Sequence, residues 1–106
     1  MDPKTQALFE ARARIIKALA HSSRLFIVHQ LSKQDFCVQE LAEMVDADIS
    51  TISKHLSVLK NAGIVKDAKD GQKVYYSLNC PCVLDFFTCV ESVIASTVKE
   101  QAELLK

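Results

Sequence analysis

Residues 45–78 read VDADISTISKHLSVLKNAGIVKDAKDGQKVYYSL, and this stretch decides the fold. Four apolar residues recur at helical spacing and predict one apolar stripe on a helix over residues 49–62: Ile49, Ile52, Leu56 and Leu59. Short polar or cationic side chains, of the kind that contact phosphates and base edges, lie between them: Ser50, Thr51, Ser53, Lys54 and His55. Gly63 predicts the end of this helix, because glycine adopts the left-handed conformation of a C-cap.

A β-hairpin is predicted directly after this helix. Residues 65–68 and 73–78 read as two short strands around Asp70-Gly71, a strong hairpin-turn signal. A short helix over residues 38–45 and a turn at 46–48 precede the polar helix, which predicts a helix-turn-helix followed by a wing. This order of parts indicates binding to double-stranded nucleic acid.

The remaining elements are helices. The pattern predicts a helix over residues 5–20, a second through Leu31 with a serine N-cap at Ser22-Ser23, and a last helix from near Pro81 to the C-terminus. Leu25 and Val28 are expected to point inward. The fold class is therefore mainly α with a small β-hairpin, a winged helix-turn-helix in one domain over residues 1–106. The broad apolar face of the last helix needs a second surface. The first helix of the same chain and the equivalent helices of a partner are expected to cover it, which predicts a homodimer with dimerisation helices at both termini.

Composition and charge limit the function further. The net charge of the chain is zero, but residues 35–48 carry five acids and no base, whereas residues 49–76 carry five lysines against two acids. The positive charge thus includes the predicted reading helix and wing, as phosphate contacts require. No apolar run approaches the roughly 20 residues of a membrane span, and no signal peptide is evident. We expect a cytoplasmic protein without a membrane partner.

An ordered set of motifs resembles the ArsR/SmtB family of metal- and metalloid-sensing repressors. The motifs are KALA at 17–20 with RL at 24–25, FCVQEL at 36–41, SKHL at 53–56, LKNAGIV at 59–65 and GQKVYYSL at 71–78. The resemblance implies a dimeric repressor whose reading helices enter successive major grooves of a palindromic operator and leave when a ligand binds. It also implies phosphate contacts from Lys69 and Lys73. Alternative interpretations are that Ser50 is only an N-cap and that His55 packs against the wing.

Four cysteines are many for a short cytosolic chain and indicate metal binding or redox chemistry. The family has a Cys-Val-Cys site on its third helix, but here Gln39 stands in place of the second thiol. Its zinc site on the last helix uses Asp and His, and residues 80–106 contain no His. Cys80, Cys82 and Cys89 remain, and three thiolates favour trivalent arsenic or antimony as the inducer. Cys37 is an alternative participant, and no organic cofactor is expected.

The position of Cys80 and Cys82 at a helix start predicts lowered thiol pKa values. Cys82 and Cys89 would lie about 10.5 Å apart along a regular helix, so the loop at 80–82 must move for all three to share one ion. Other interpretations are a thiol-redox or persulfide sensor, a cadmium or lead sensor, or buried structural cysteines at positions 37 and 89. No catalytic triad, phosphate-binding glycine loop or Cys-x-x-Cys motif occurs, so an enzyme is not expected.

Overall fold

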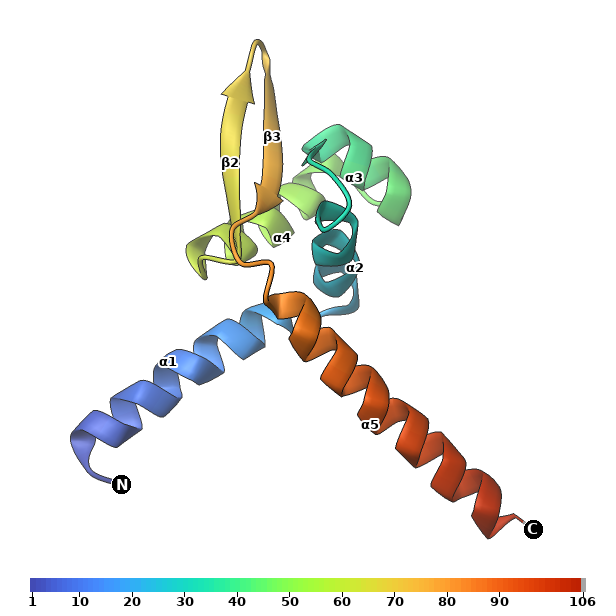
Figure 1. Cartoon of the computed structure of the whole chain (residues 1–106). Helices are drawn as coiled ribbons and strands as arrows, with labels where there is room; N and C mark the ends of the chain where they lie inside the picture. Colours follow the sequence, from blue (N-terminus) through green and yellow to red (C-terminus); the bar gives the residue numbers. More distant parts are fainter. Residues whose placement is uncertain (106) are drawn as a thin grey trace.

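Five helices and a three-stranded antiparallel sheet make up residues 1–105, the part of the chain that the computed structural model describes (Figure 1). The elements are α1 (Pro3–Leu19), α2 (Ser22–Leu31), β1 (Phe36–Cys37), α3 (Val38–Val45), α4 (Ile49–Asn61), β2 (Val65–Asp70), β3 (Lys73–Leu78) and α5 (Val83–Leu104). Helices α2, α3 and α4 lie together at the base of the β2–β3 hairpin, while α1 and α5 extend away from them in different directions. The winged helix-turn-helix predicted from the sequence is confirmed.

The sheet contains one strand that the sequence pattern did not predict. β1 pairs with β3, with Phe36 opposite Tyr76 and Cys37 opposite Tyr75, so the strand order is β1-β3-β2. A two-residue strand is too short to show alternation in the sequence. Its effect is to join the start of α3 to the wing by backbone hydrogen bonds.

The core lies between α2, α3 and α4, because each helix turns one apolar face towards the others. The largest fully buried side chains come from all three helices: Ile27, Val28, Leu41, Ile52, Leu56 and Leu59. The expectation that Leu25 points inward is wrong, since it is 38% exposed. Ile49, the first residue of the predicted apolar stripe, is 55% exposed.

The end of α4 is fixed by backbone hydrogen bonds. Gly63 has a φ of 82°, its N–H donates to the Lys60 carbonyl, and the N–H of Ile64 donates to the Leu59 carbonyl, each at 3.0 Å. This pair of bonds is a Schellman motif, which confirms the predicted glycine stop. At the start of α2 the prediction was wrong: the Nδ1 atom of His21, and not a serine oxygen, accepts the N–H of Ser23 at 3.1 Å. The last helix starts at Val83, two residues later than expected, because residues 80–82 form a turn.

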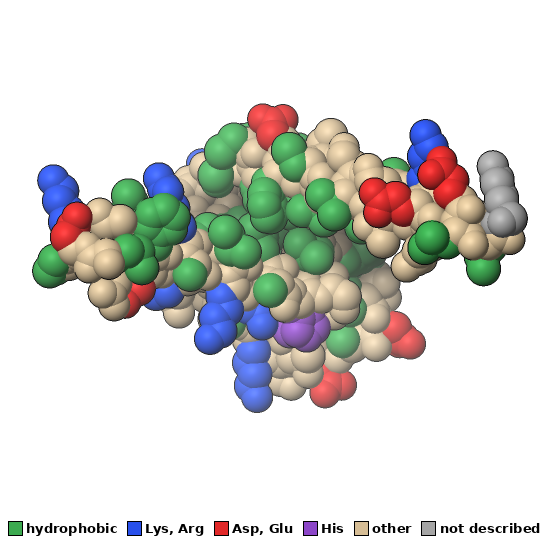
Figure 2. Space-filling model, turned by 90° about the horizontal axis from the view of Figure 1, so that it is seen from below, with side chains coloured by type: hydrophobic (Ala, Val, Ile, Leu, Met, Phe, Trp, Pro, Cys, Tyr) green, Lys and Arg blue, Asp and Glu red, His purple; other side chains and the backbone are tan. Residues whose placement is uncertain are grey.

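Helices α1 and α5 carry apolar side chains that the rest of the chain does not cover. Leu8, Phe9 and Ile15 of α1 are about half exposed, and Val93, Ile94 and Val98 of α5 are more than half exposed. Figure 2 shows apolar side chains spread across this underside of the molecule. Within residues 1–105, no helix is long and apolar enough to cross a membrane.

Candidate nucleic-acid interface and thiol site

Helix α4 has two chemically different sides. Ile52, Leu56 and Leu59 are fully buried and fix the orientation of the helix against α2 and α3. On the other side, Ser50, Thr51 and Lys54 are exposed, and Ser53 is partly buried. Asp48 is the N-cap residue, so Ser50 lies inside the first turn and is not the cap. The exposed side thus offers hydroxyls and one ammonium group that are free to contact a ligand.

His55 is partly buried because its ring packs against another histidine. The ring centroids of His55 and His21 lie 4.4 Å apart, which joins α4 to the start of α2. Burial, the largest cause, and the nearby positive charge of Arg24 lower the pKa of His55. The lowered pKa favours the neutral ring of His55, which makes the ring a weaker partner for a phosphate than the ammonium group of Lys54.

The wing presents two lysines near its tip. Lys69 and Lys73 are exposed at the ends of β2 and β3, on either side of a turn in which Gly71 has a φ of 65°. Lys60 differs from them, because its Nζ atom lies 2.9 Å from the Asp67 carboxylate. This exposed ion pair joins the end of α4 to β2, and it leaves Lys60 less able to neutralise a phosphate.

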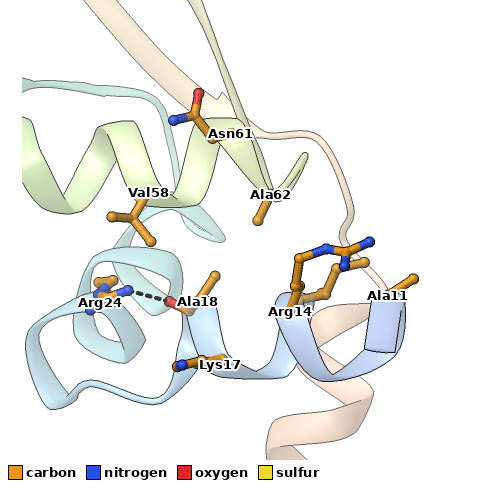
Figure 3. Close-up of a pocket in the computed structure, with 9 residues that line it drawn as sticks. Ala11, Arg14, Lys17, Ala18, Arg24, Val58, Asn61 and Ala62 are labelled. Atoms are coloured by element: carbon orange, nitrogen blue, oxygen red, sulfur yellow. Dashed lines mark hydrogen bonds between the residues drawn. The ribbon is translucent and has the colours of Figure 1, made fainter. Parts of the chain in front are cut away.

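A basic groove lies between α1, α2 and the end of α4 (Figure 3). It has a volume of about 530 Å³, and Arg14, Lys17 and Arg24 line it with no acidic residue. The guanidinium group of Arg24 donates a hydrogen bond to the Ala18 carbonyl oxygen at 3.1 Å. The groove extends the positive charge beside the reading helix onto α1 and α2.

Two of the predicted thiols lie together. The Sγ atoms of Cys80 and Cys82 are 3.1 Å apart in the turn between β3 and α5. The N–H of Val83 donates to the Cys80 carbonyl at 3.2 Å, which closes the turn and brings the two thiols to the same side. Cys80 is partly buried and Cys82 is exposed. The pair is therefore accessible to a small thiophilic molecule.

The expected lowering of the thiol pKa is wrong for Cys80. The hydrogen bond shared with Cys82, partial burial and the charge of Cys82 together raise the pKa of Cys80. These effects outweigh the backbone N–H of Val83, which acts in the opposite direction. A ligand that bonds to both sulfurs must displace both thiol protons, and the raised pKa of Cys80 makes one of them harder to remove.

The other two cysteines lie apart from this pair. Cys89 is exposed on α5, two helical turns beyond the N-cap residue Cys82, and Cys37 is buried where β1 meets α3. The N–H of Cys37 donates to the Glu40 carboxylate at 3.0 Å. Within residues 1–105, no three Cys, His, Asp or Glu side chains are close enough together to hold a metal ion.

Asn79 is a residue at this site that the sequence pattern did not single out. Its backbone N–H donates to the Ile64 carbonyl at 2.9 Å, and its side-chain amide donates to the Gly63 carbonyl at 3.2 Å. Both acceptors directly follow the end of α4. These two bonds hold Asn79, the residue before Cys80, against the segment that follows the reading helix. An asparagine between a strand and a thiol gives no sequence signal for such a long-range contact.

Comparison with known proteins agrees with this geometry. Residues 21–67, which span α2 to the first half of β2, match the family model described as "Bacterial regulatory protein, arsR family". The nodulation protein NolR of Rhizobium meliloti is 30% identical over 93 residues, which cover 88% of this chain and 76% of NolR. The chain belongs to the ArsR family. It is therefore a DNA-binding transcriptional regulator and not an enzyme.

Other similar proteins extend the comparison. The cadmium resistance regulatory protein CadC of Listeria innocua is 46% identical over 61 residues, which cover 57% of this chain and 51% of CadC. Among solved structures, NolR from Sinorhizobium fredii superposes with a TM-score of 0.81 at 29% identity, covering 88% of this chain and 93% of that one. The homodimeric winged helix-turn-helix domain of Mb0332 from Mycobacterium bovis has a TM-score of 0.80 at 28% identity, covering 94% and 93%.

Proposed function

We propose that this ArsR-family regulator is a homodimeric repressor of a metalloid-resistance operon that trivalent arsenic or antimony releases from its operator. The observation that carries the proposal is the thiol pair Cys80–Cys82, with sulfur atoms 3.1 Å apart at the junction of wing and α5. Because operator DNA lies in the cytoplasm, the proposal includes a cytoplasmic location for the protein.

The DNA contacts in this proposal come from α4 and the wing. The exposed first turns of α4 enter the major groove, where Ser50 and Thr51 reach base edges or phosphates and Lys54 contacts a phosphate. Ser53 and His55, which are partly buried, contact DNA at the edge of this surface. Lys69 and Lys73 neutralise phosphates from the wing.

Dimerisation uses the helices at both ends of the single domain. The uncovered apolar side chains of α1 and α5 are the support for this assignment, since their burial against a second copy is favourable. The homodimer recorded for Mb0332 gives further support. Two-fold symmetry would then present two copies of α4 to the two half-sites of a palindrome.

The sulfur donors fit a soft ion. Two sulfur atoms closer than about 4.6 Å can both lie within a typical 2.3 Å metal–sulfur bond of one ion, and the Cys80–Cys82 separation meets this condition. Cys89 supplies the third sulfur in the proposal, and residues 80–82 must move along α5 to bring the pair to it. Cys37 is the alternative third donor, although its burial makes it less accessible.

A second candidate function is thiol oxidation, and the same thiol pair favours it. Two thiols give up two protons and two electrons to form a disulfide, while an oxidant such as a peroxide is reduced to water. Only two sulfurs are needed, which agrees with the lack of a three-donor group within residues 1–105. The similarity to CadC keeps cadmium, and with it lead, as further candidate ligands.

A ligand titration separates these candidates. Operator DNA selected with the full chain is labelled, and the complex is titrated with arsenite, antimonite, cadmium, lead, peroxide and polysulfide while fluorescence anisotropy is followed. The proposal predicts release by arsenite and antimonite at the lowest concentrations, reversed by a competing dithiol. Release by peroxide or polysulfide alone would support the redox function, and release by cadmium or lead alone would support a divalent-ion sensor.

A further inference from the structure

Ile49 is an apolar side chain on the face of α4 that reads DNA. It is the first residue of α4 and is 55% exposed, whereas Ile52, one turn later, is fully buried. Its neighbours Ser50 and Thr51 are exposed as well. Ile49 therefore makes little contribution to the core, and its side chain is available to whatever the start of α4 contacts.

The surroundings of Ile49 form a shallow groove between the start of α3, the start of α4 and the wing. The groove has a volume of about 270 Å³, and its lining residues are Cys37, Val38, Gln39, Ile49, Lys73 and Val74. Val74 of β3 is 36% exposed. Two exposed branched aliphatic side chains thus lie on one groove, with the exposed ammonium group of Lys73 at the same place.

The charges around the groove favour a base edge over a phosphate beside Ile49. Asp48, the exposed residue directly before Ile49, repels a phosphate at this position. The carboxylate of Glu40 accepts the Cys37 N–H at 3.0 Å, so it is held at the start of α3. Lys73 remains to neutralise a phosphate on the wing side of the groove. An apolar group of the DNA is consequently the partner that fits Ile49.

We propose that Ile49 and Val74 form a socket for the C5-methyl group of a thymine in the operator. The thymine methyl is the one apolar group that distinguishes bases in the major groove, and aliphatic side chains read it by contact. The start of a recognition helix is also the part that reaches base edges. This inference rests on the proposed role of α4 in DNA binding and adds a base preference to it.

Replacement of thymine by deoxyuridine tests the socket, because it removes only the methyl group. The operator is selected from a random duplex library with the full chain, and each thymine is replaced singly. Dissociation constants are measured for the wild type, Ile49→Ala and Val74→Ala. At one thymine in each half-site, we expect the wild type to lose about fourfold in affinity, equivalent to the roughly 0.8 kcal/mol of one buried methylene. Ile49→Ala should bind the thymine and uracil operators equally at that position.

Val58→Ala is the matched control, since Val58 is an exposed aliphatic residue near the other end of α4. It should keep the full preference for thymine, and thermal melting should show that all variants remain folded. If no thymine position loses its methyl preference in Ile49→Ala, the socket is wrong while operator binding stands. If the wild type selects no duplex at all, both the socket and the proposed function are contradicted.

Discussion

The side-chain amide of Asn79 donates a hydrogen bond to the carbonyl oxygen of Gly63, 3.2 Å away, and so joins the thiol turn to the end of the reading helix. Gly63 completes the Schellman motif of α4, and Asn79 directly precedes Cys80. A movement of residues 80–82 would therefore pull on the segment that ends α4. In the proposed sensor, this contact would connect a ligand bound at the thiol turn to the end of α4 through a few residues.

Asn79→Ala tests this route. The variant should bind operator within about threefold of the wild type, because Asn79 does not lie on the exposed side of α4. The factor by which arsenite raises the operator dissociation constant should be about fivefold smaller than in the wild type, as expected when a hydrogen bond of about 1 kcal/mol no longer carries the coupling. Operator dissociation constants with and without saturating arsenite give this factor. Gln34→Ala removes an exposed amide from the connector after α2 and should leave the coupling unchanged.

Lys54 and Lys60 lie on the same helix but differ in their partners. Lys54→Ala should weaken operator binding and lower the slope of log affinity against log salt by about one, because one phosphate contact is lost. Lys60→Ala should change the slope much less, since Lys60 is paired with Asp67 at 2.9 Å. Anisotropy titrations over a range of salt concentrations give both slopes. Equal slopes for Lys54→Ala and the wild type would show that Lys54 does not contact a phosphate.

The contact between His21 and His55 predicts a loss of stability in acid. The pKa of His55 is lower in the folded chain than its ordinary value of 6.5, mainly because burial penalises the charged ring. The unfolded chain therefore binds the proton more readily, and the free energy of unfolding should fall as the pH drops below about 6.5. Urea unfolding at pH 7.5 and 5.5 measures this change, and His55→Gln should show a smaller one. If the free energy of unfolding changes equally between pH 7.5 and 5.5 in the wild type and in His55→Gln, protonation of His55 does not cause the loss of stability.

The helical core could be predicted from the sequence because it depends on a local pattern. The spacing of Ile52, Leu56 and Leu59 holds over about two turns, and the Gly63 stop is set by backbone conformation alone. Ile49 fits the same spacing but is the first residue of α4, and it lies beyond the surface that α2 and α3 cover. Periodicity gives the direction of a side chain and does not show whether another element reaches it.

The thiol site was predictable only in part, because its geometry depends on a turn and on contacts across the chain. The segment from Cys80 to Cys82 identified two neighbouring sulfurs, and the turn brings them within 3.1 Å. The raised pKa of Cys80 comes first from the thiol beside it, an effect that the position at a helix start does not reveal. The bond from Asn79 to Gly63 joins residues 16 apart and has no sequence signature.

The most direct test of the thiol sensor is arsenite-driven release of the operator from the full chain and its cysteine variants. We expect Cys80→Ser and Cys82→Ser each to bind operator like the wild type but to need at least about tenfold more arsenite for release, a difference of roughly 1.4 kcal/mol. Cys37→Ser, which changes the buried cysteine, should respond like the wild type. If both Cys80→Ser and Cys82→Ser release the operator at the same arsenite concentration as the wild type, the two thiols are not the sensor.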